Sequence, residues 1–141
     1  MLEALKLSLA PEAVVAFIIY LAGALVLFHL FKFAYTRITP HKEFALIRDG
    51  NVAAAVALSG ALIGFAIPTS NVIAYSVSFL DFIVWALIAG FVQLLGFLIS
   101  TLVVKGASER IKNDEVATGI YVAAVSICLG LINAACMTPA A

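Results

Sequence analysis

The chain has 141 residues, of which 65% are hydrophobic and 11% are charged, and its eight bases balance its eight acids. This excess of apolar residues is typical of a membrane protein and excludes an ordinary soluble domain. The zero net charge and the lack of Lys/Arg runs exclude the basic surface that nucleic acids need, so we expect no nucleic-acid partner.

The first apolar stretch runs from residue 13 to residue 31, after a short segment that contains Glu3, Lys6 and Glu12. It is longer than the roughly 7 to 15 apolar residues of a signal peptide. Lys32 follows it without a convincing cleavage site. We therefore interpret this stretch as a retained transmembrane helix.

Four stretches have the about 20 mostly apolar residues that a helix needs to cross a bilayer. They are Ala13–Tyr35, Val52–Val72, Val77–Val104 and Val116–Met137. The sequence therefore predicts an all-α integral membrane protein with four transmembrane helices. We expect residues 1–141 to form a single membrane domain.

Charged residues gather in the first and third connections, whereas the second connection, expected as a turn at Pro68–Asn71, has none. Lys and Arg in short loops favour the cytoplasmic side. Both charged connections are therefore expected inside, with both termini on the outer side. The bases that would form this inner surface are Arg37, Lys42, Arg48, Lys105, Arg110 and Lys112.

A short stretch of sequence occurs twice. IRDGNVAAAVALSG begins at Ile47, and the similar IKNDEVATGIYVAA begins 64 residues later, at Ile111. Both stretches stand at the inner start of a predicted span. We therefore predict two helical-hairpin repeats of the same orientation, about residues 12–71 and 72–137, related by a pseudo-two-fold axis along the membrane normal.

Polar residues stand at the inner starts of the second and fourth spans. Asp49 or Asn51 can cap one helix, and Asn113 or Asp114 can cap the other, with Glu115 near the positive end of the helix dipole. A second hypothesis stays open. Asn51 and Glu115 hold matched positions in the repeat, so they could face each other as a gate or an ion site.

Small residues recur at spacings of three and four in the second and fourth spans. Such faces let helix backbones approach closely in lipid. We expect these two spans to pack against each other or across a subunit boundary, and we expect a homo-oligomer. The main helix-packing candidates are Ala57, Gly60, Gly64, Ser126 and Gly130.

Ionisable and amide groups inside spans are few, and each has two interpretations. His29 is either hydrogen-bonded to a neighbour or proton-linked. Gln93 forms either an interhelical hydrogen bond or, with His29, a polar waypoint on a water-lined path. Asp81 lies four residues before Trp85, an expected interfacial anchor, so we expect an outer polar position. Tyr20 and Tyr35 are further candidates for the interfacial aromatic belt.

The sequence contains no P-loop, GxSxG, HExxH or dinucleotide glycine pattern, and no acids at metal-ligand spacing. We therefore expect no enzyme activity, cofactor or metal. His41 is assigned to a loop. Cys128 and Cys136 stand eight residues apart on one helix, too far to pair within a chain, so they act as membrane thiols or, at Cys136, as an intermolecular link.

Three segments carry a family resemblance: GNVAAAVALSGALIG from Gly50, Asp81 before Trp85, and GLINAACM from Gly130. Over about residues 13–137 the chain resembles the YjfL-like bacterial inner-membrane proteins, the domain of unknown function 350 family. The resemblance implies a duplicated two-helix unit, a multi-pass inner-membrane location and no established activity. It also implies an association with cytoplasmic membrane-stress proteins of the phage-shock type.

Two functions remain open. The first is a non-enzymatic, oligomeric membrane protein whose inner bases bind anionic lipid or a cytoplasmic membrane-stress protein. The second is a subunit of a small oligomeric ion channel or transporter, in which Asn51 and Glu115 line the inner mouth and His29 and Gln93 lie along the path.

Overall fold

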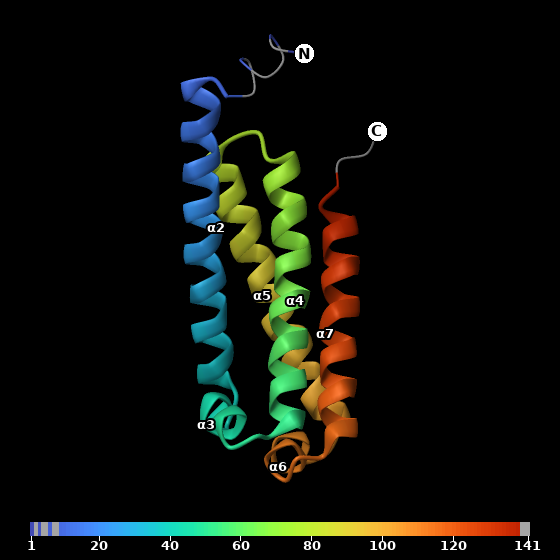
Figure 1. Cartoon of the computed structure of the whole chain (residues 1–141). Helices are drawn as coiled ribbons and strands as arrows, with labels where there is room; N and C mark the ends of the chain where they lie inside the picture. The colour runs from blue at the N-terminus through green and yellow to red at the C-terminus, as the bar shows by residue number, and fades with distance from the viewer. Residues whose placement is uncertain (2, 4–5, 7–8, 139–141) are drawn as a thin grey trace.

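A computed structural model describes residues 1, 3, 6 and 9–138 (Figure 1). Its described residues are helical or irregular and contain no strand. The helices are α2 (Pro11–Ile38), α3 (Glu43–Arg48), α4 (Val52–Tyr75), α5 (Phe79–Val103), α6 (Ala107–Lys112) and α7 (Val116–Cys136). The four longest are long and apolar enough to cross a membrane. The predicted all-α fold with four candidate spans is therefore confirmed.

The long helices run side by side, and α4 occupies the centre of the bundle (Figure 1). Of the four candidate spans, α4 is the most buried and α2 the least. The described parts nearest the two termini lie at one end of the bundle, and α3 and α6 lie at the other. We call these the termini end and the α3/α6 end.

The α4–α7 contact is the closest in the bundle, because glycines replace side chains at the crossing. A methyl group added at Gly60 would overlap the backbone of Ala123. One added at Gly130 would overlap the carbonyl of Gly64. Without a hydrophobic driving force between helices in lipid, such direct backbone contact supplies the van der Waals energy of association. The small-residue faces of α4 and α7 therefore pack against each other within one chain.

Aromatic side chains connect α2 to the rest of the bundle. The rings of Phe31 and Phe65 stack with centroids 4.3 Å apart, and Tyr35 lies 4.7 Å from Phe97. Tyr35 is only 1% exposed. The prediction that Tyr35 belongs to a lipid-facing interfacial belt is therefore wrong, since its ring packs in the protein core.

The predicted turn at Pro68–Asn71 is also wrong. Helix α4 continues through Pro68 to Tyr75, and the connection to α5 is formed by residues 76–78. A proline inside a helix leaves a carbonyl without its usual donor, but packing and side-chain hydroxyls can maintain the helix in a membrane. Here the carbonyl without its donor is that of Gly64, which lies against Gly130 of α7, and Pro68 is itself buried. The hydroxyls of Thr69 and Ser70 donate to other carbonyls of α4, those of Phe65 and Ile67.

The turns that lead into α4 and α7 share one hydrogen-bond pattern. In the first, Asp49 N donates to Ala45 O, Gly50 N to Ile47 O and Asn51 N to Leu46 O. The same three bonds recur 64 residues later, from residues 113, 114 and 115 to residues 109, 111 and 110. The middle residue has a positive φ in both turns, +86° at Gly50 and +58° at Asp114. The recurring sequence thus encodes a recurring turn, whereas the duplication of whole hairpins stays a prediction.

Gly130→Ala should lower the free energy of unfolding by about 1–3 kcal/mol, because the added methyl meets backbone that cannot move without separating α4 from α7. Denaturant titration of the purified protein in neutral detergent would measure this change. Gly23→Ala is the matched control, since its methyl would meet only ring atoms of Phe79 and Phe82. An equal loss in both variants would contradict the close-packing explanation.

Candidate functional site

A cluster of buried polar side chains lies at the α3/α6 end. His41 Nδ1 is 2.8 Å from the hydroxyl oxygen of Ser108, at the start of α6. His41 Nε2 is 3.8 Å from a carboxyl oxygen of Glu43, the first residue of α3. The side chains of His41 and Glu43 are only 3% and 1% exposed. The cluster therefore connects the α2–α3 segment to α6.

This cluster leaves hydrogen-bonding groups without partners. His41 Nε2 and both carboxyl oxygens of Glu43 are buried and have no hydrogen-bond partner among the described residues. A buried, unpaired charge would be costly, so both groups favour their neutral forms. Burial raises the pKa of Glu43 to about 7, which the nearby Thr39 hydroxyl partly opposes. Burial also lowers the pKa of His41, helped by Lys112 and opposed by Glu109.

Local sequence explains how His41 and Glu43 reach the interior while the residue between them stays outside. Thr39 ends α2, and its hydroxyl donates to the carbonyl of Tyr35. The chain then bends between α2 and α3, and burial alternates along this segment. His41 and Glu43 are buried, whereas Pro40 and Lys42 are exposed. The assignment of His41 to a loop holds, but its pairing with Ser108, 67 residues away, was not predicted.

The six predicted inner bases divide into two groups. Arg110 pairs with Glu115, and Lys112 Nζ lies 2.6 Å from a carboxylate oxygen of Glu109. The other four, which we call the unpaired bases, form no ion pair with a described residue. They stand in the last turn of α2, just before α3, at the end of α3 and after α5: Arg37, Lys42, Arg48 and Lys105.

Asn51 and Asp114 join the starts of α4 and α7. The side chain of Asn51 accepts from Ala54 N at 2.7 Å and donates to the carbonyl of Ile111 at 2.8 Å. Asp114 reaches across to accept from Ala53 N at 2.8 Å. Asn51 thus caps its own helix and also bonds to the end of α6. Glu115 bonds to Arg110, and no hydrogen bond joins it to Asn51 among the described residues.

The two intramembrane candidates lie in different surroundings. His29 is exposed on α2, and its Nδ1 is 2.8 Å from the Leu25 carbonyl of the same helix. Gln93 is 1% exposed and donates to the Ser126 carbonyl at 2.7 Å, across the space that Gly64 leaves open. Among the described residues no hydrogen bond joins these two side chains. Gln93 therefore connects α5 to α7.

Asp81 and the cysteines lie at the bundle surface. Asp81 is in the first turn of α5, where Ser78 Oγ accepts from Asp81 N and Asp81 accepts from Val77 N. Ser78 thus caps α5, and Asp81 bonds back to the residue before the cap. Cys128 and Cys136 are free and exposed. Within the part of the chain that the structure describes, no three His, Cys, Asp or Glu residues are grouped to hold a metal.

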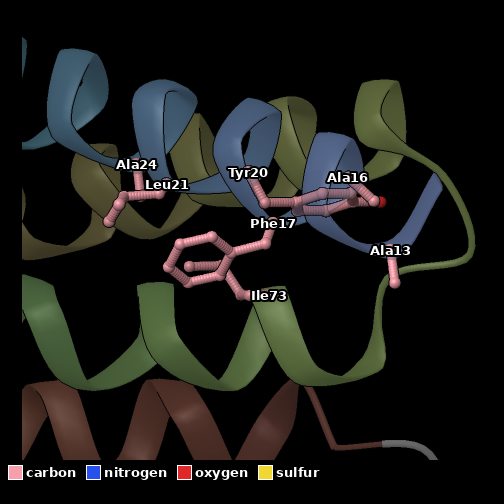
Figure 2. Close-up of a pocket in the computed structure, with 7 residues that line it drawn as sticks. All are labelled: Ala13, Ala16, Phe17, Tyr20, Leu21, Ala24 and Ile73. Carbon is pink, nitrogen blue, oxygen red and sulfur yellow. The ribbon is translucent and has the colours of Figure 1, made fainter. Parts of the chain in front are cut away.

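An apolar groove of about 440 Å³ opens between α2 and α4 near the termini end. Figure 2 shows six of its side chains on α2 and Ile73 on α4, with the ring of Phe17 close to Ile73. Residues Ala13, Ala16 and Ala24 provide little bulk, so α2 offers an uneven surface rather than a filled one. This surface lies on the least buried of the four spans.

Comparison with known proteins agrees with this architecture. A family model described as Domain of Unknown Function (DUF350) matches residues 8–137. The chain belongs to the DUF350 family. Two similar relatives, both described as UPF0719 inner membrane protein YjfL, come from Escherichia coli strain K12 and from Escherichia coli O157:H7. Each is 38% identical over 127 residues, which cover 90% of this chain and 96% of the relative.

No solved structure matches this DUF350 chain. The predicted resemblance is nevertheless confirmed by the family match and by the two relatives. The relatives are inner-membrane proteins by name, and this chain has four helices able to span a bilayer. The predicted location as a multi-pass inner-membrane protein is therefore confirmed.

The stability of this DUF350 protein should depend on the protonation of Glu43. The folded state keeps the proton up to about pH 7, whereas the unfolded chain releases it near pH 4.5. Stability from this group is thus fully present below pH 4.5 and declines as the pH rises to about 7. Glu43→Gln should remove this decline and stabilise the protein at pH 8 by up to about 3 kcal/mol.

Denaturant titrations of wild type and variant between pH 4.5 and pH 8 would measure this difference. His41 faces Glu43 and Ser108. The charges of Lys112 and Glu109 also act on its pKa, in opposite directions. The contribution of His41 to stability has the opposite pH dependence, because it falls as the pH drops below about 6.5. This contribution is present in both wild type and Glu43→Gln. Glu12→Gln, an exposed acid at the other end, is the control. Parallel pH curves for wild type and Glu43→Gln would refute the assignment.

Proposed function

We propose that this protein is a non-enzymatic component of the inner membrane that binds anionic lipid headgroups through its unpaired bases. The observation that supports this proposal is that only two of the six predicted inner bases form ion pairs with acids among the described residues. Arg110 and Lys112 already donate to acids, whereas Arg37, Lys42, Arg48 and Lys105 have no acidic partner among the described residues. Each base near an anionic membrane contributes about 1 kcal/mol of attraction.

Aromatic side chains beside one of these bases, Arg37, and beside the nearby Lys32 suit a position at the membrane surface. The Arg37 guanidinium lies 4.5 Å from the centre of the Phe33 ring, and Lys32 lies 5.9 Å from that of Phe44. Both rings are exposed, so each presents an apolar face beside a positive charge. Such pairs place a ring at the acyl boundary and a cation at the headgroups.

The buried cluster supports the same function because it fixes the segment that carries Lys42. His41 and Glu43 are held inside on either side of this lysine, and His41 reaches Ser108 on α6. A held backbone loses less conformational entropy when a lipid binds. On the predicted orientation the surface faces the cytoplasm, where it would also be accessible to a membrane-stress protein.

Lys42→Gln/Arg48→Gln should weaken binding of phosphatidylglycerol by about 2 kcal/mol, close to thirtyfold, because two unpaired bases are lost. Titration of a fluorescent phosphatidylglycerol into the protein in neutral maltoside micelles would measure the affinity without dependence on topology. The matched control is Arg110→Gln/Lys112→Gln, which also removes one arginine and one lysine. An equal loss in both would show that net charge, rather than the unpaired bases, controls binding.

A homo-oligomer also belongs to the proposal, and α2 is the helix that we assign to its contact. The small-residue faces of α4 and α7 are already used within the chain. The exposed side of α2 carries the apolar groove beside Phe17, which is 65% exposed. Association in lipid needs complementary surfaces that improve packing. A second copy of this chain, inserting apolar side chains into the groove, would supply such packing.

Phe17→Ala should shift the native mass of the protein in lipid nanodiscs toward the monomer, because Phe17 forms one wall of the groove. Phe91→Ala is the control, since Phe91 is similarly exposed (63%) but lies on α5. A wild-type mass of one protomer would refute the oligomer. A closed ring of four or more would instead favour the channel hypothesis and would justify flux assays on Glu115→Ala and His29→Ala.

A further inference from the structure

A second cavity, of about 390 Å³, opens at the termini end, away from the unpaired bases. The last turn of α4, the connection to α5, the first turns of α5 and the end of α7 surround it. Its polar and aromatic walls include Tyr75, Ser76, Asp81, Trp85 and Thr138. The side chains of Asp81 and Trp85 stand one helical turn apart on α5, so they share one face of the helix.

The charges around this cavity favour a cation. Asp81 Oδ2 accepts from Val77 N at 3.1 Å, and no described base pairs with the carboxylate. The cap formed by Ser78 and Asp81 already occupies the positive start of α5, which would otherwise attract an anion. Lys6 is the base of the first described residues, and its Nζ lies 3.9 Å from a carboxylate oxygen of Glu3, so it already has an acidic partner. The Asp81 carboxylate is therefore available to a positive ligand.

The other walls narrow the chemistry of that ligand. The hydroxyl of Ser76 is buried and has no hydrogen-bond partner among the described residues, although its residue lines the cavity. A buried hydroxyl without a partner is uncommon, and an N–H donor would satisfy it. Indole and phenol rings attract cations through their faces, tryptophan most strongly. Carboxylate, hydroxyl and aromatic walls together suit an ammonium group on an organic molecule.

We propose that this cavity binds an organic ammonium group, held by the Asp81 carboxylate, the Ser76 hydroxyl and the rings of Trp85 and Tyr75. Two sources share this chemistry. One is the headgroup of an amine-bearing phospholipid in the adjacent leaflet, and the other is a soluble alkylamine. The site is independent of the proposed lipid binding, because it lies at the opposite end of the bundle and selects the opposite charge.

Trp85 is the single tryptophan of the chain, so its fluorescence reports directly on this cavity. Purified full-length protein in neutral maltoside micelles is titrated with methylammonium chloride, and sodium chloride at the same concentrations serves as the ionic control. We expect a saturable change with methylammonium that sodium does not reproduce. In parallel, phosphatidylethanolamine and phosphatidylglycerol are added to the same micelles. Tighter binding of phosphatidylethanolamine than of methylammonium identifies the lipid headgroup as the source.

Asp81→Asn should weaken methylammonium binding about fivefold. An asparagine oxygen can still accept from Val77 N, and Ser78 can still cap α5, so the local hydrogen bonds remain while the charge is removed. Glu12→Gln removes another described acid, from the first turn of α2, and should leave the affinity unchanged. If Asp81→Asn lowers the melting temperature, Tyr75→Ala replaces it, with about threefold weaker binding expected.

Three results would overturn the proposal. The first is an equal response to sodium and methylammonium, and the second is an unchanged affinity in both Asp81→Asn and Tyr75→Ala. The third is no response to either methylammonium or phosphatidylethanolamine. A response to methylammonium alone would support the site and assign it to soluble amines.

Discussion

The contact between α4 and α7 is the constraint on which the rest of this bundle depends. Gly60, Gly64 and Gly130 let the two backbones meet directly, and any side chain there would separate the helices. The approach also fixes the position of Gln93, whose amide fills the space over Gly64 and bonds to α7. In a lipid environment, where burial of apolar side chains gives no net advantage, this contact area is the main source of specific association.

This close packing also limits what the interior can do. The centre of the bundle is occupied by backbone, small side chains and aromatic rings, and the buried amides of Gln93 and Asn133 are used in helix-to-helix bonds. The predicted polar path would need His29 and Gln93 to meet, yet one is exposed and the other buried. Function is therefore more easily placed at the ends and on the outer surface of the bundle than through its middle.

The two ends differ in chemistry. At the α3/α6 end, the buried side chains of His41 and Glu43 hold a segment that exposes Lys42, and neighbouring bases have no acidic partners among the described residues. At the termini end, Asp81 and Trp85 line a cavity without a basic neighbour among the described residues. A protein built in this way can contact opposite charges at its two ends while its core stays closely packed.

The amino-acid sequence by itself determined the helical class, the four apolar spans, the family and the membrane location, because these follow from composition, length and local similarity. It also marked the small-residue faces, whose spacing is a local property of a helix. It misplaced the turn at Pro68, since local proline chemistry favours a break that packing against α7 overrides. Only the tertiary structure decided that His41 meets Ser108 and that Asp114 caps α4, because each contact joins residues more than 60 positions apart. Such pairs depend on how the helices pack, which no local pattern encodes.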